Sequence, residues 1–232
     1  MRRLLPLIAL ALAACSQSAP TPEAPKPQAS ASAAISAPPV PDGAPVILAF
    51  GDSLYAGYRL APGQGYPPRL EAALNASGVK ARVVNAGVSG DTTAAARARL
   101  AFTLDNQKVK PTLVMVGLGG NDMLRGLPPA ETRANLDAIL TELEKRQVPA
   151  MLTGMLAAPN MGQDYVSAFN PIYPALAAKH KAPLIPFFLQ SVIGNEALML
   201  DDHIHPNPQG VDKIVAATKE EVAKALKAAM AP

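Results

Sequence analysis

The chain has 232 residues, of which 49% are hydrophobic and 17% charged, enough apolar material for one substantial core. The net charge of +3 overstates its basic character, because the 21 basic residues fall to 19 without Arg2 and Arg3 of the leader, against 18 acidic ones. No basic stripe interleaved with aromatic residues is visible, which argues against nucleic acid as a partner. The single cysteine, Cys15, excludes an internal disulfide and leaves the rest of the chain without a thiol nucleophile.

The first fifteen residues predict a lipoprotein signal peptide. Two arginines precede an apolar run that is short for a membrane span. The run ends in Leu-Ala-Ala-Cys at 12–15, which resembles a bacterial lipobox, so we expect Cys15 to be lipidated. Ordinary cleavage, with Cys15 discarded or incidental, is the alternative. Ser16 after the cysteine favours, by resemblance to such lipoproteins, release to an outer membrane, and the expected location is the cell envelope, at the outer membrane or periplasm.

Residues 16–45 contain eight prolines and eight alanines and no aromatic residue. Such a segment buries too little surface to offset its chain entropy, so we expect a Pro/Ala-rich disordered tether. The folded domain then spans residues 46–232, with no internal repeat and no second domain.

From residue 46 onward, short apolar runs alternate with helical patterns. Strands are expected at 46–50, 82–86, 113–117, 150–155 and 183–188, and helices at 69–76, 91–102, 131–146, 165–181 and from 208. Pro171 and Pro174 should kink the fourth helix or delay its start. Asn207 should cap the last helix, with Pro208 in its first turn. The alternation predicts an α/β protein with a three-layer α/β/α flavodoxin-like fold, a five-stranded parallel sheet and the first strand at the switch point.

The first strand runs directly into Gly51-Asp52-Ser53-Leu54. A buried strand that stops at a glycine turn places the next side chain at the carboxyl end of the sheet, where open α/β folds hold their ligand crevice. Ser53 is therefore a candidate nucleophile, provided that the chain also supplies a base, a group to orient it and donors for an oxyanion. By itself, Gly-Asp-Ser is also an ordinary turn.

Partner motifs for the serine follow in order along the chain. They are Gly87 after the second strand, Gly119-Gly120-Asn121-Asp122 after the third, and Asp202-His203-Ile204-His205-Pro206 near the C-terminus. Together with the Gly-Asp-Ser-Leu motif they resemble the SGNH (GDSL-type) hydrolase family. Within that family, the chain looks most like the bacterial multifunctional thioesterase I, arylesterase and lysophospholipase group. The likeness covers about residues 45 to 228, and four motifs in register are far more specific than one.

The resemblance implies a serine esterase that hydrolyses carboxylic esters through an acyl-enzyme. Ser53 would be the nucleophile, His205 the base and Asp202 the carboxylate that orients the imidazole. The backbone amides of Ser53 and Gly87 and the side-chain amide of Asn121 would form the oxyanion hole. Taken singly, Gly87, Gly119-Gly120 and Asn121 are better explained as turn and cap residues.

Several neighbouring residues have competing readings. Asp52 is expected to be a turn or cap residue, and Asp201 is the fallback orienting carboxylate. His203 stands where thioesterases of this group usually have glycine, and a second imidazole could compete as base, bind a stray metal or face solvent; we treat it as a bystander. His180 is expected on the surface, near the negative end of a helix.

The loops around Ser53 should set the acyl specificity. Tyr58, Leu156, Pro159 and Tyr165 are candidates for an apolar groove, although such residues more often only pack. No His-x-x-x-His pair or phosphate-binding glycine loop is present, so neither a metal nor a cofactor is expected. The expected partners are a small acyl ester, thioester or lysophospholipid and, through the lipid anchor, a membrane. An envelope polysaccharide O-deacetylase of the same family and a non-catalytic envelope lipoprotein are the alternatives.

Overall fold

The computed structural model describes residues 43–231. The predicted signal peptide, Cys15 and residues 16–42 of the predicted tether lie outside these residues. None of the helices within 43–231 is long and apolar enough to cross a membrane.

Five parallel strands form one sheet in the order β2-β1-β3-β4-β5, which confirms the predicted flavodoxin-like topology. The strands are β1 (Val46–Gly51), β2 (Arg82–Gly87), β3 (Leu113–Gly117), β4 (Ala150–Thr153) and β5 (Leu184–Ile185). The chain leaves β1 first toward β2 and then returns to its other side with β3, so β1 lies at the switch point. Strand β1 is buried along its whole length, as its unbroken apolar sequence predicts for a strand covered on both faces.

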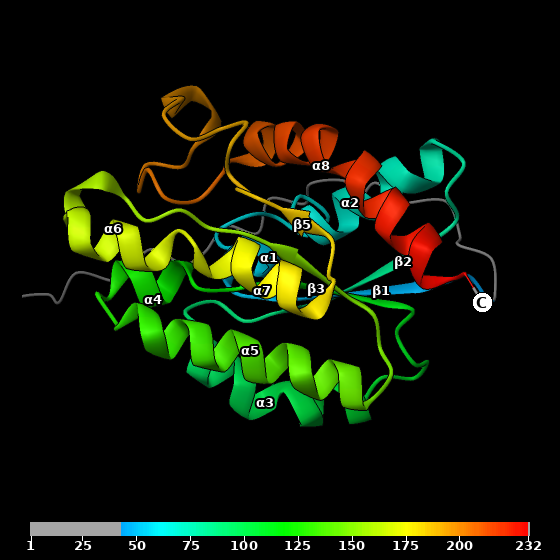
Figure 1. Ribbon diagram of the computed structural model, residues 1–232. Helices are drawn as coiled ribbons and strands as arrows, with labels where there is room; N and C mark the ends of the chain where they lie inside the picture. The colour runs from blue at the N-terminus through cyan, green and yellow to red at the C-terminus, as the bar shows by residue number, and fades with distance from the viewer. Residues whose placement is uncertain (1–42, 232) are drawn as a thin grey trace, which may run out of the picture. The chain divides into compact units, whose positions relative to one another are not determined.

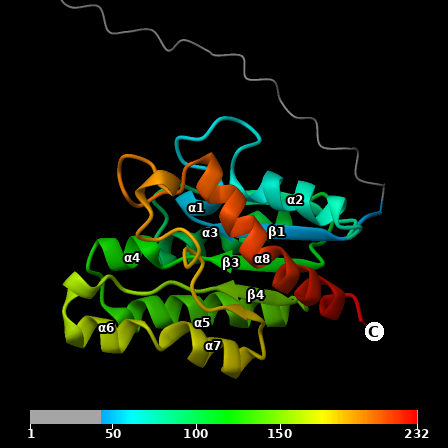
Figure 2. The same cartoon turned by 90° about the horizontal axis from the view of Figure 1, so that it is seen from above.

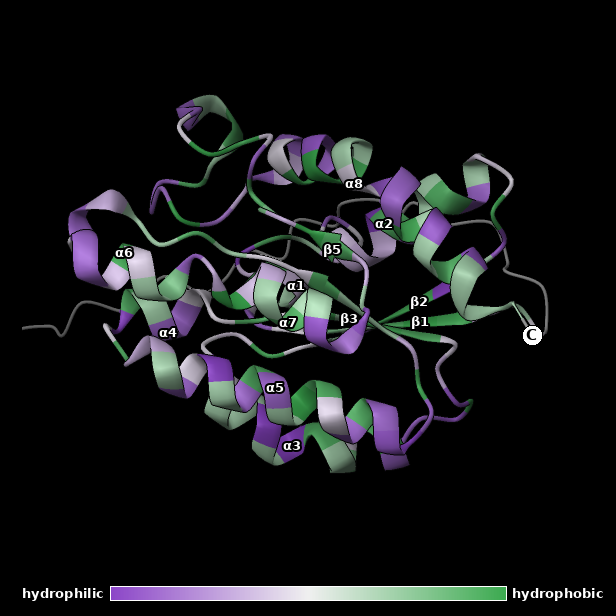
Figure 3. Cartoon of the chain, in the orientation of Figure 1, coloured by the Kyte–Doolittle hydropathy of each residue, from purple (hydrophilic) through white to green (hydrophobic). Residues whose placement is uncertain are grey.

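Helices cover both faces of the sheet (Figures 1 and 2). Helices α2 (Tyr66–Ala76) and α8 (Pro208–Ala229) pack together on one face, and α3 (Thr93–Asp105), α5 (Pro129–Lys145) and α7 (Ile172–His180) lie on the other. Figure 3 shows hydrophobic central strands between helices that carry both polar and apolar residues. This is the arrangement expected of amphipathic helices that cover a sheet.

Helix α8 begins where its sequence signals predict. The Asn207 side chain accepts a hydrogen bond from the Gly210 N–H at 3.0 Å, and Pro208 occupies the first turn. The helix is held to α2 by a 2.8 Å hydrogen bond between the Tyr66 and Thr218 hydroxyls. The start of α8 therefore fixes the loop that immediately precedes it, which carries His205.

Some elements differ from the predictions. The expected helix at 165–181 is divided into α6 (Gln163–Phe169) and α7, with Pro171 as the N-cap of α7. Pro171 has no N–H with which to continue the hydrogen bonding of α6. The preceding residue, Asn170, accepts a hydrogen bond from the Ala157 N–H with its side-chain oxygen, which ties the break to the loop after β4. Strand β5 is shorter than residues 183–188. Unpredicted short helices are α1 (Ser53–Ala56) and α4 (Gly120–Leu124), with 3-10 turns η1 (Pro159–Met161) and η2 (Glu196–Leu198).

The expectation of a surface-exposed His180 is wrong. It lies at the C-terminal end of α7, as predicted, but its side chain is only 5% exposed. The ring nitrogens lie 2.7 Å from carboxylate oxygens of Asp137 and Glu144, both on α5. The imidazole therefore contributes to the packing of α7 against α5.

Three glycines stand in register across the carboxyl edge of the sheet, because Gly51 of β1 is paired with Gly87 of β2 and with Gly117 of β3. Helix α1 folds back over this row. A Cβ atom on Gly87 would lie 2.4 Å from the backbone nitrogen of Ala56, and one on Gly51 would lie 2.6 Å from the Tyr55 ring. Only glycine leaves room for α1, and hence Ser53, to lie directly on the sheet.

Replacing Gly87 with alanine should push α1 away from β2. The clash is with backbone atoms, so we expect Gly87→Ala to lower the free energy of unfolding by about 1 to 3 kcal/mol, measured by urea denaturation. Gly120→Ala is the matched control, since its new Cβ would meet nothing closer than 3.6 Å. Equal stability of the Gly87 and Gly120 variants would contradict this packing argument.

Candidate active site

The serine and the C-terminal histidine meet at the carboxyl end of β1. Ser53 is the first residue of α1, and its Oγ lies 2.8 Å from the Nε2 atom of His205. This is the distance over which an imidazole can take a proton from a hydroxyl. Both side chains are partly accessible, so a substrate can reach them.

Asp202 holds His205 from the opposite side of the ring. Its Oδ2 lies 2.8 Å from His205 Nδ1, while its Oδ1 accepts hydrogen bonds from the backbone N–H groups of Ile204 and His205, each at 2.9 Å. Partial burial raises the pKa of Asp202, but these hydrogen bonds outweigh it and lower that pKa to about 2. The carboxylate is thus ionised at neutral pH and favours the imidazole tautomer that leaves Nε2 free to accept a proton.

The side chains of the neighbouring candidates, Asp201 and His203, take no part in the bonds between Ser53, His205 and Asp202. Asp201 forms a two-point ion pair with Arg59, at 2.7 and 3.3 Å, and its side chain is 75% exposed, so it does not orient the imidazole. His203 has a φ of +56°, the left-handed region that glycine adopts most readily. Its exposed side chain lines the cavity around Ser53 but forms no hydrogen bond to Ser53 or Asp202 within the described residues.

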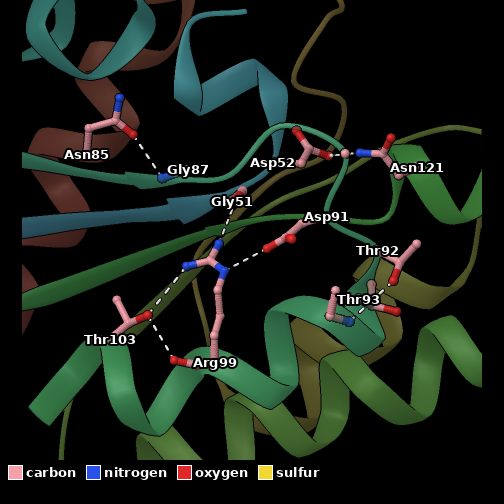
Figure 4. Close-up of polar contacts among 12 residues, drawn as sticks. Gly51, Asp52, Asn85, Gly87, Asp91, Thr92, Thr93, Arg99, Thr103 and Asn121 are labelled. Carbon is pink, nitrogen blue, oxygen red and sulfur yellow. Dashed lines mark hydrogen bonds and ion pairs between the residues drawn. The ribbon is translucent and has the colours of Figure 1, made fainter.

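The predicted oxyanion donors are only partly brought together. Ser53 and Asn121, the second residue of α4, both line one cavity. Gly87 does not line it, because its backbone N–H donates to the Asn85 side chain at 2.9 Å and its Cα lies under α1 (Figure 4). The expectation that Gly87 donates to an oxyanion therefore does not agree with this geometry.

Gly90, which the sequence reasoning passed over, occupies the position where Gly87 was expected. It has a φ of +86° and lines the cavity together with Ser53 and Asn121. Among residues 43–231, no acceptor is bonded to its N–H. The available signal was the Ser-Gly-Asp-Thr sequence at 89–92, because a glycine two residues before a helix cap, here Thr92, is a common place for an exposed backbone amide.

The cavity over Ser53 has a volume of about 610 Å³ and is lined mainly by apolar side chains. Tyr58, Leu156 and Pro159 lie in its wall as expected, and the ring of Tyr58 lies 4.5 Å from that of His205. Tyr165 does not contribute to it; its hydroxyl donates to the Leu127 carbonyl at 2.9 Å and its ring stacks on Phe169. The sequence reasoning missed further apolar wall residues, namely Leu54, Met123, Leu124, Met155, Phe187, Leu189, Ile193 and Ile204.

Comparison with known proteins identifies this arrangement. The model of the GDSL-like lipase/acylhydrolase family matches residues 49–213, the stretch that contains all of these motifs. The chain belongs to this family. The resemblance to SGNH (GDSL-type) hydrolases is confirmed, and family membership makes the protein a carboxylic ester hydrolase.

The match to this chain covers most of the length of two named members of the family. Esterase TesA of Pseudomonas aeruginosa is 41% identical over 163 residues, 70% of this chain and 80% of that protein. Thioesterase 1/protease 1/lysophospholipase L1 of Escherichia coli K12 is 40% identical over 164 residues, 71% and 76%. Among solved structures, the SGNH-hydrolase family esterase AlinE4 matches with a TM-score of 0.68 and 55% identity, covering 78% of this chain and 96% of that one.

Three buried carboxyl groups, those of Asp52, Asp91 and Asp122, belong to the site region of this GDSL-like hydrolase, and Figure 4 shows the first two. Asp91 accepts a hydrogen bond from Arg99 Nε at 2.6 Å, and Asp122 accepts one from the Thr93 backbone at 2.8 Å. The Asp52 side chain caps α1 by accepting from the Leu54 N–H at 3.0 Å, as expected for a cap residue. No group of three or more metal-ligating side chains occurs within the part of the chain that the structure describes.

Proposed function

We propose that this GDSL-like hydrolase is a serine esterase that cleaves carboxylic esters with apolar acyl groups through an acyl-enzyme on Ser53. The observation that carries the proposal is the hydrogen-bonded series Ser53 Oγ, His205 Nε2, His205 Nδ1 and Asp202 Oδ2, with 2.8 Å at both steps. The cavity above Ser53 supplies the acyl site.

Acylation begins when His205 Nε2 takes the Ser53 proton and the serine oxygen attacks the ester carbonyl. Negative charge moves onto the carbonyl oxygen, where the N–H groups of Ser53 and Gly90 and the amide of Asn121 are available as donors. The imidazolium, stabilised by the ionised Asp202, then protonates the leaving alcohol. Water repeats the sequence on the acyl-enzyme, with His205 again as base, and releases the acid and free Ser53.

The cavity favours an acyl chain over an acetyl group. Its rim carries five of the large hydrophobic side chains that are exposed among residues 43–231, namely Tyr58, Leu124, Leu156, Ile193 and Ile204. Exposed apolar groups concentrated around one opening are characteristic of a site for an apolar ligand. Fatty acyl esters, thioesters and lysophospholipids share this chemistry. A polysaccharide O-deacetylase would need polar contacts for the sugar instead.

We further propose that the enzyme is anchored in the cell envelope through a lipid on Cys15, at the outer membrane or periplasm. The support is the basic, apolar and Leu-Ala-Ala-Cys sequence of residues 1–15, followed by the Pro/Ala-rich segment 16–45. Such a tether would allow the hydrolase domain to reach substrates at the membrane surface.

Ser53→Ala should abolish ester hydrolysis and labelling by a fluorophosphonate probe, because both need the serine oxygen. His205→Ala should lower kcat by at least about a thousandfold, whereas His203→Ala should change it by less than about fivefold. The measurements are p-nitrophenyl butyrate hydrolysis and gel fluorescence after labelling. Unlabelled but correctly folded wild-type protein would support a non-catalytic lipoprotein instead.

A series of p-nitrophenyl esters from acetate to palmitate tests the acyl specificity. We expect kcat/KM to rise from acetate to octanoate by about tenfold or more, since each buried methylene contributes about 0.8 kcal/mol. Leu156→Ser should flatten this rise while leaving acetate hydrolysis unchanged. A sharp preference for acetate, together with release of acetate from envelope polysaccharide, would favour the deacetylase.

Radioactive palmitate supplied to cells that produce the full chain should label the wild-type protein and should not label Cys15→Ala, because the thiol is the lipid acceptor. The Cys15→Ala protein should also leave the membrane fraction. Ser16→Ala is the matched control and should remain labelled. Lipid incorporated into the Cys15→Ala protein would exclude this site of attachment.

A further inference from the structure

Asp52 lies between the nucleophile and one of the oxyanion donors. Its side chain is 2% exposed, and it immediately precedes Ser53. One carboxyl oxygen accepts the Leu54 N–H at 3.0 Å, and the other lies 3.5 Å from the Nδ2 atom of Asn121, a contact marked in Figure 4. Asp52 thus contacts both the helix that carries the serine and the amide that faces the substrate.

Capping alone does not explain an aspartate at this position. Serine, threonine or asparagine caps a helix as well as aspartate does, without burying a carboxyl group. Within the described residues, no cation is bonded to Asp52; Arg99 donates instead to Asp91 and to the Gly51 carbonyl. An unpaired buried carboxyl group is costly, so its presence beside the nucleophile calls for another role.

We propose that Asp52 is a positioning residue for the oxyanion hole: its carboxyl oxygen holds one amide hydrogen of Asn121, so that the other points at the substrate oxygen. A side-chain amide has two hydrogens in fixed directions, and anchoring one fixes the second. The inference rests on the proposed serine esterase function and adds to it the group that orients the donor. Asp52 also borders the cavity, but its side chain is only 2% exposed, so it acts through Asn121 and not directly on the substrate.

The charge of Asp52 matters as much as its geometry. An ionised Asp52 and a developing oxyanion compete for the same amide, so ionisation should weaken stabilisation of the transition state. The titratable groups that face Asp52 are Asp91, Asp122, Tyr55 and Tyr173. Burial raises the pKa of Asp52 to about 7, and the two carboxylates add to this rise, against hydrogen bonds from Leu54 and Asn121. Below that pH the carboxyl group is neutral, so no negative charge on Asp52 competes with the oxyanion for the Asn121 amide.

A double-mutant cycle tests the positioning role. Asp52→Ser retains the helix cap but is too short to reach Asn121, so we expect kcat for p-nitrophenyl butyrate to fall about 10- to 100-fold with KM nearly unchanged. In an Asn121→Ala background, the same substitution should have no further effect, because the group through which Asp52 acts is already gone. Additive losses of kcat in the double variant would overturn the proposal.

The pH profile provides a second readout that a purely structural role would not change. Asp52→Asn removes the ionisation and retains an oxygen that caps α1, but its NH2 group then lies opposite the Asn121 NH2 group and cannot accept from it, so we expect a lower kcat/KM at every pH. We expect wild-type kcat/KM to decline by about tenfold between pH 7 and pH 9, and the Asp52→Asn variant to show no such decline. A flat wild-type profile, or the same decline in the variant, would overturn the proposal.

These outcomes are separable from failure of the proposed function. If the wild-type protein neither hydrolyses esters nor reacts with a fluorophosphonate probe, the esterase assignment fails, and with it the inference. If the wild-type protein is active and Ser53→Ala is inactive while Asp52→Ser has full turnover, only the inference fails. Thermal unfolding followed by circular dichroism establishes that each variant is folded under the assay conditions.

Discussion

The packing of α1 on the row of glycines is the interaction on which the site depends. Tyr55, two residues after Ser53, is 1% exposed and lies over this row. Its hydroxyl is bonded to the Thr153 hydroxyl at 2.8 Å, and its ring stacks on Tyr66 and meets Phe188 edge-on, both at 5.5 Å. Burial holds the pKa of Tyr55 well above its ordinary value, so the phenol stays neutral. The nucleophile is thus attached to a short helix whose position is set by the core.

Three buried carboxyl groups lie in the same region, and they differ in the hydrogen-bond donors and cations that stabilise them. Asp91 is neutralised by Arg99, whose guanidinium also lies 4.3 Å from the centre of the Phe50 ring. Asp122 is satisfied by backbone and hydroxyl donors from Thr93 and Thr132. Among the described residues, Asp52 alone of these three has neither a cationic nor a hydroxyl partner, and it is the one next to the reacting serine. Polar groups that are least compensated and closest to the chemistry are those from which function is expected.

The sequence predicted the elements that depend on local pattern. Continuous apolar runs located the strands, and Asn207 with Pro208 located the start of α8, because these signals act over a few residues. Helix α1 was missed, since four residues are too few for a periodic pattern. The break at Pro171 was expected only as a kink, and whether a proline bends or ends a helix depends on tertiary partners such as the Ala157 N–H.

Site residues that act through a distinctive side chain could be predicted from the sequence, whereas those that act through the backbone could not be predicted as well. Ser53, Asp202 and His205 carry distinctive side chains, and the structure brings them within hydrogen-bond distance. A backbone N–H donor cannot be recognised by residue type, because every residue except proline has one. Gly87 and Gly90 are indistinguishable by type; the helix cap after Gly90 was a weak local signal, and the fold shows that Gly87 lies under α1 while Gly90 faces the cavity. Tyr165 was misplaced for a similar reason, because an apolar ring after a strand packs as readily as it binds.

Ser53 and His205 are separated by 152 positions along the chain, and α8, which fixes the histidine loop, follows all five strands of the sheet in the sequence. Until the segment around His205 has been made and has folded against the end of β1, the Ser53 hydroxyl therefore has no base and remains an ordinary serine. Chemical competence arises only once both ends of the domain have come together. A condition that loosens the contact between α8 and α2 would therefore separate the base from the nucleophile.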